Sequence, residues 1–60
     1  MAENVIDTVR DTINFLRKAA AELREAAMSE PEVAQQLRHM ADQCEAEADE
    51  LSERFGIEPD

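Results

Sequence analysis

Residues 28–33 read Met-Ser-Glu-Pro-Glu-Val, and this short stretch separates two segments that share one apolar repeat. Ser29 and Glu32 have the S-x-x-E spacing of a capping box, in which two side chains satisfy free amide groups at a helix start. Pro31 suits the first turn of that helix, because its missing N–H would have no carbonyl partner there. The stretch therefore predicts a tight turn followed at once by a helix.

Apolar residues recur on both sides of this stretch at alternating spacings of three and four, which is the heptad pattern of packed α-helices. The pattern predicts helices over about 4–28 and about 30–55, joined by a turn at 28–31, with a short tail at 56–60. The residues that we expect in the core of the hairpin or of its dimer are Ile6, Val9, Ile13, Leu16, Ala20, Leu23, Leu37, Ala41, Cys44, Ala48, Leu51 and Phe55.

Both ends of the predicted hairpin carry helix signals. Asn4 and Asp7 resemble a capping pair that opens the first helix. Gly56 suits the left-handed position that ends the second helix, and Pro59 would prevent its continuation. Because the turn is short, the two helices should lie antiparallel within one domain that spans residues 1–60.

The size of the chain favours association. A domain of 60 residues buries only about 60% of the surface of its unfolded chain, and a single cysteine provides no internal disulfide. A lone hairpin leaves one apolar side open, so we expect an all-α antiparallel hairpin that forms a homodimeric four-helix bundle. No apolar run approaches the ~18 residues of a membrane span, and the acidic start lacks the basic region of a signal peptide, which favours the cytoplasm.

The formal net charge of −9 is unevenly distributed. Residues 29–60 hold ten acidic residues against two arginines, whereas residues 1–28 are almost neutral. This balance disfavours DNA and anionic membranes as partners and permits a basic protein. The acidic residues that we expect to line the outer face of the second helix, as a solvated surface or as the binding surface for such a partner, are Asp42, Glu45, Asp49 and Glu53.

Few residues suggest chemistry. Cys44 falls on the apolar seam, where an inert buried thiol is the expected interpretation. His39 falls on the opposite face without a second histidine, so a solvated side chain is expected there. We expect no catalytic residue, no metal, no cofactor and no enzymatic activity. Phe15 interrupts the polar side of the first helix and could pack at the edge of a dimer or anchor a partner.

Three segments resemble the Rop-type plasmid copy-number regulators, which are small helical hairpins. The segments are Phe15-Leu16-Arg17, Ala48-Asp49-Glu50-Leu51 and Arg54-Phe55-Gly56, within a resemblance that covers roughly residues 10–56. It implies a dimeric antiparallel four-helix bundle whose first helices bind paired RNA loops. Asp11 and Ala19 stand where that family has amide side chains, and Ala26 where it has a lysine. We therefore carry over the architecture and keep RNA as an alternative partner.

Three functions follow as expectations. The first is a regulator or inhibitor that binds a basic protein surface through the acidic residues of the second helix. The second is Rop-like RNA binding by the outer face of the first helix, where the contact residues would be Phe15, Arg10, Arg17 and Lys18. The third is a purely structural oligomerisation module.

Overall fold

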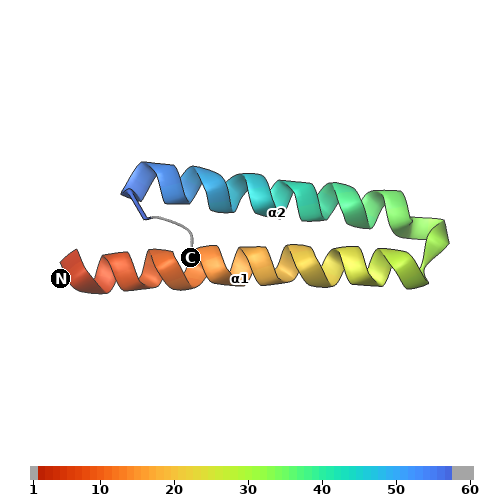
Figure 1. Cartoon of the computed structure of the whole chain (residues 1–60), viewed down its shortest axis with the longest axis horizontal. Coiled ribbons are helices and arrows are strands. Elements are labelled where there is room, and N and C mark those ends of the chain that lie inside the picture. Colours follow the sequence, from red (N-terminus) through yellow and green to blue (C-terminus); the bar gives the residue numbers. More distant parts are fainter. Residues whose placement is uncertain (1, 58–60) are drawn as a thin grey trace.

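The chain folds as an antiparallel pair of helices. In the computed structural model, which describes residues 2–57 and the side chains of residues 4–57, helix α1 spans Ala2–Ser29 and helix α2 spans Ala34–Phe55. A short 3₁₀ helix, η1 (Pro31–Val33), joins them. The two long helices lie side by side along a molecule of 45 × 17 × 15 Å (Figure 1). The predicted all-α hairpin is confirmed.

Helix α1 begins earlier than its sequence signal indicates. Asn4 already lies inside the helix, and its carbonyl oxygen accepts a hydrogen bond from the hydroxyl of Thr8 at 2.8 Å. The hydroxyl of Thr12 bonds the carbonyl of Thr8 in the same way, at 2.9 Å. The predicted capping role of Asn4 is therefore wrong, because a residue inside the helix cannot cap its start.

The connection between the helices is built by backbone bonds. The Glu30 amide still donates to the Ala26 carbonyl at 3.0 Å, which continues the α-helical pattern past Ser29. The Val33 amide then donates to the Glu30 carbonyl at 3.1 Å and closes η1, with Pro31 as its first residue. Among the side chains that the structure describes, none caps the start of η1 or of α2. The predicted capping box is wrong, because Ser29 belongs to the end of α1 and not to the start of the next helix.

The end of α2 follows its prediction. Gly56 adopts φ 65° and ψ 31°, the left-handed conformation that favours glycine. The amide of Gly56 donates to the Glu53 carbonyl at 3.4 Å, and that of Ile57 donates to the Ser52 carbonyl at 2.9 Å. These two bonds form a Schellman motif, and the Ser52 hydroxyl adds a bond to the Ile57 carbonyl. Pro59 lies outside the described residues.

The buried core consists almost entirely of small side chains. Its apolar members recur at every seventh position on each helix, namely Ile13, Ala20, Ala27, Ala34, Ala41 and Ala48. Three of these alanines, at positions 20, 41 and 48, expose none of their surface. Alanine allows two helices to approach closely, but it contributes little apolar area to the core. Counted outward from the turn, the buried residues form three layers: Ala27 with Ala34, Ala20 with Ala41, and Ile13 with Ala48.

The larger core candidates are less covered in the single chain than the alanines are. Seven of them are only half-buried in the single chain: Ile6, Val9, Leu16, Leu23, Leu37, Cys44 and Leu51. Phe55 is exposed, because it is the last residue of α2 and lies at the open end of the hairpin. The hairpin therefore buries its alanines and leaves most of its large apolar side chains partly accessible to solvent.

Candidate interaction surfaces

Helix geometry divides the hairpin into two flanks. Successive residues of an α-helix are rotated by 100°, so a residue four positions after a buried one lies about 40° to one side of it. A residue three positions after a buried one lies about 60° to the other side. Because the helices are antiparallel, equivalent positions of α1 and α2 share a flank. The first flank holds Arg17, Arg24 and Glu45, and the second holds the half-buried leucines.

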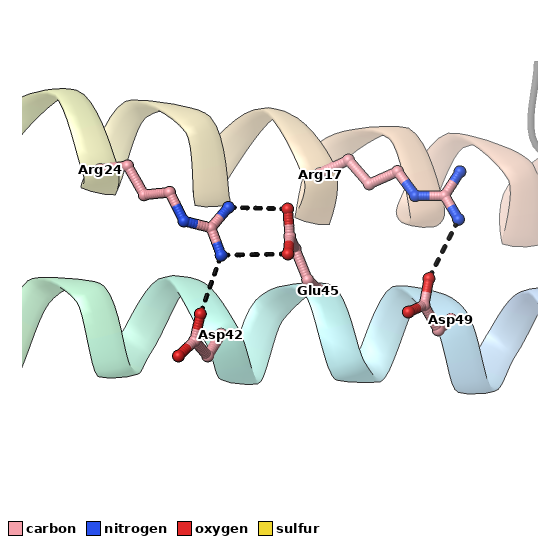
Figure 2. Close-up of polar contacts among 5 residues, drawn as sticks. All are labelled: Arg17, Arg24, Asp42, Glu45 and Asp49. Atoms are coloured by element: carbon pink, nitrogen blue, oxygen red, sulfur yellow. Dashed lines mark hydrogen bonds and ion pairs between the residues drawn. The ribbon is translucent and has the colours of Figure 1, made fainter.

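An ion-pair network occupies the first flank (Figure 2). The Arg24 guanidinium donates from Nη1 to Glu45 Oε2 at 2.7 Å and from Nη2 to Glu45 Oε1 at 3.0 Å. Its Nη2 also donates to Asp42 Oδ1 at 2.8 Å. Farther from the turn, Arg17 Nη2 donates to Asp49 Oδ1 at 3.3 Å. Two arginines of α1 thus hold three carboxylates of α2.

The network shifts the titration of its central pair. Hydrogen bonds from Arg24 lower the pKa of Glu45 below its ordinary value, against an opposing effect of desolvation. The charges of Arg24 and Arg17 lower the pKa of Glu45 further. Reciprocally, the hydrogen bonds to Glu45 and Asp42 raise the pKa of Arg24. Both groups are therefore charged at neutral pH and attract each other across the seam between the helices.

This network changes the interpretation of the predicted acidic surface. Asp42, Glu45 and Asp49 are exposed, as expected for the outer face of the second helix, but their position next to α1 engages all three in ion pairs. They lie beside the seam and pair with arginines of the same chain. Glu53 is exposed and takes part in none of the ion pairs among residues 4–57. The sequence contained a signal for this pairing, because Arg17 and Arg24 are seven residues apart and so are Asp42 and Asp49.

The second flank is apolar and open. Its inner row holds Val9, Leu16, Leu23, Leu37, Cys44 and Leu51, which are all half-buried. Its outer row adds Val5, Val33 and Met40, which are all exposed. Where the first flank is closed by ion pairs, this one presents large side chains to solvent. Apolar patches of this kind on small proteins commonly mark interaction sites.

The residues of the RNA alternative are dispersed. The Phe15 side chain is 70% exposed and borders a shallow depression with Lys18, Ala19 and Glu22. Arg10 pairs instead with Asp7 of its own helix at 3.6 Å. Arg17 reaches across the seam to α2, away from that depression. The structure thus brings Phe15 and Lys18 together and directs the two arginines elsewhere.

The two residues with possible metal or redox chemistry stand apart. His39 is exposed on the side of α2 away from the seam, next to Gln35, Gln36 and Met40 along a shallow depression. Cys44 is a free thiol on the apolar flank, and it is half-buried where full burial was expected. In the part of the chain that the structure describes, no three His, Cys, Asp or Glu side chains gather as metal ligands could. Neither α1 nor α2 has an apolar stretch that could cross a membrane.

None of the family models, curated proteins or solved structures that were compared with the chain matches it.

Proposed function

We propose that this chain is a non-enzymatic interaction protein that acts as a homodimer, in which two hairpins join their apolar flanks into a four-helix bundle. The observation that carries the proposal is that small side chains are buried within the hairpin, whereas most large apolar side chains are not. Alanines fill the seam within one hairpin, whereas the leucines and Met40 extend beyond it. Burying those larger side chains against a second hairpin adds the apolar area that a 60-residue chain lacks.

The exposed area supports the same proposal. The chain has 4736 Å² of accessible surface. A folded monomer of 6.8 kDa is expected to expose about 4,000 Å². The difference is close to the ~800 Å² that each partner contributes to a protein interface of standard size. A second hairpin on the apolar flank would remove an area of this order.

The proposal predicts that the chain has the mass of a dimer in solution as long as its apolar flank is unchanged. Sedimentation equilibrium of the full chain should give a dimer, and Leu37→Glu should shift it to monomer. The matched control is Gln35→Glu, which adds the same charge to the exposed side of the same helix and should leave the dimer unchanged. A wild-type chain that stays monomeric at every concentration while it remains helical would contradict the proposal.

A basic protein surface remains the partner class that we propose for such a dimer. Long-range attraction depends on net charge, and residues 29–60 keep their excess of acids although four of these are paired within the chain. A partner isolated from the native host and purified should bind with an affinity that falls steeply as salt rises. Glu53→Lys should weaken that binding more than Glu25→Lys, which makes the same charge change on α1. Binding that is insensitive to salt would exclude this partner class.

A Rop-like RNA binder is the second candidate, and the exposure of Phe15 beside Lys18 favours it. Aromatic side chains stack on unpaired bases, and a neighbouring cation contacts phosphate. A gel-shift assay with paired RNA hairpins tests it, with Phe15→Ala against wild type. A shift that Phe15→Ala abolishes would favour RNA, and the absence of any shift would remove the candidate.

A further inference from the structure

The apolar flank also specifies how two copies would meet, an inference that rests on the proposed dimer. Two hairpins can face each other across a two-fold axis in two ways. In one, the axis runs along the helices, both turns lie at the same end, and α1 faces the partner's α2. In the other, the axis crosses the helices, the turns lie at opposite ends, and each helix faces its own counterpart. We propose that the second copy binds with its turn at the same end.

The outer row of the apolar flank distinguishes the two arrangements. On α1 this row contains small or apolar residues throughout, namely Val5, Thr12, Ala19 and Ala26. On the 3₁₀ helix and α2 the row changes from apolar to charged with distance from the turn. Its residues there are Val33, Met40, Glu47 and Arg54. Its half near the turn is therefore apolar on both helices, and its far half carries charge on α2 alone.

With both turns at the same end, each residue keeps its level along the bundle. Ala26 and Val33 directly precede the buried pair of Ala27 and Ala34, so Val33 would face Ala26 of the partner subunit. One heptad farther from the turn, Met40 would face the partner's Ala19. Each large apolar side chain then meets a small one, which is the complementarity that packed helix faces require. At the open end Glu47 would face the partner's Thr12 and Arg54 the partner's Val5, so only Arg54 would meet an apolar side chain.

With the turns at opposite ends, positions on α2 reverse about its centre near Cys44. Met40 would then face the partner's Glu47, and Val33 would face Arg54 of the partner subunit. Both contacts place a charged group against an apolar side chain, and removing a charged group from water carries a desolvation cost. The inner row of leucines pairs acceptably in both arrangements, so the outer row decides between them.

Charge favours the same choice. Helix α2 holds six acidic residues against two arginines, whereas α1 is nearly neutral. Turns at opposite ends would bring two acidic helices together along their length. Turns at the same end alternate acidic and neutral helices around the bundle, which lowers the repulsion between them.

Distances between spin labels test the arrangement directly. We would place one label at Glu30→Cys, in the turn, after replacing the native thiol by Cys44→Ala. Turns at the same end should give a label separation below about 30 Å, because neighbouring helix axes in a bundle lie only ~10 Å apart. Turns at opposite ends should give a separation close to the 45 Å length of the hairpin. A label at Lys18→Cys, near the middle of α1, serves as the control, because neither arrangement separates its two copies by the length of the hairpin.

Oxidation of the native thiol, Cys44, is an independent test of the arrangement. With turns at opposite ends, Cys44 would face the partner's Cys44, and diamide would oxidise the two thiols to an intermolecular disulfide. In the proposed arrangement it faces the partner's Leu16, and no disulfide-linked dimer should form. A long label separation together with that disulfide would overturn the arrangement while the dimer stands. A monomer in sedimentation equilibrium would overturn both proposals.

Discussion

Arg24 of α1 binds Glu45 of α2 with both terminal nitrogens of its guanidinium, at 2.7 and 3.0 Å. This bidentate geometry is the most directional contact that an arginine makes with a carboxylate. It joins two helices whose seam consists mainly of alanine, a residue with no shape to fix the sliding of one helix along the other. We infer that the pair sets the register of the hairpin more than its stability.

Arg24→Gln should therefore lower the thermal midpoint by a few degrees at most, because an exposed ion pair contributes little net free energy. The effect should shrink as salt rises and screens the pair. Arg54→Gln is the control, since Arg54 pairs with Glu50 of its own helix at 3.0 Å and should matter less. Circular dichroism melts at low and high salt measure both variants. Equal effects of the two substitutions would show that the interhelical pair has no special role.

The stability of the wild-type chain should fall on acidification as Glu45 becomes protonated. Because folding lowers the pKa of Glu45, its contribution is fully present above the pKa of the unfolded chain and is lost as the pH drops through the lower folded pKa. Arg24→Gln removes the main cause of that shift and should flatten this part of the pH profile. Urea unfolding between neutral and strongly acidic pH, with both proteins side by side, measures the difference. Identical profiles would contradict the assignment.

Ala20→Leu should destabilise the protein by about 1–3 kcal/mol, because the alanine is fully buried and the added carbons force the helices apart. Ala21→Leu makes the same change at the next residue, which is exposed, and should be nearly neutral. Urea unfolding at a fixed chain concentration compares the two variants. A neutral result at position 20 would show that the seam is looser than its burial indicates.

Gly56→Ala should cost about 1 kcal/mol, which is the usual penalty for a side chain in the left-handed conformation. A β-carbon at this position would meet no atom within 4 Å, so the backbone conformation alone causes the loss. Gly56→Asn should cost less, because asparagine tolerates this conformation better. Thermal melts of the two variants measure the order, and a larger loss for asparagine would indicate a steric cause instead.

Periodicity predicted most of the fold. The heptads gave two helices and their antiparallel pairing, and Gly56 correctly marked the end of α2. The predicted caps failed at Asn4 and Ser29, because a cap signal shows that a residue could begin or end a helix but not whether the helix continues through it. Backbone hydrogen bonds around Glu30 determine where α1 ends, and no side chain in the sequence indicates them.

The candidate surfaces were harder to predict. Treating α2 as a single helix made Asp42 and Asp49 appear to belong to a free acidic face. Only the position of α1 alongside it reveals that Arg24 and Arg17 pair with them. Ser52 was missed for a similar reason, since its burial depends on the turn of the chain at Gly56. Contacts between the two helices depend on which residues lie at the same level, and the sequence pattern predicts that alignment only to within about a residue.

The seven-residue spacing of the buried side chains, from Ile13 to Ala27 and from Ala34 to Ala48, has a geometrical consequence. A straight α-helix turns once every 3.6 residues, so a repeat of seven drifts around its surface by about 20° per heptad. Two helices that keep such a repeat in contact must wrap around each other with a left-handed supercoil. The apolar flank then winds along the molecule, and a second copy with the same repeat has the matching curvature.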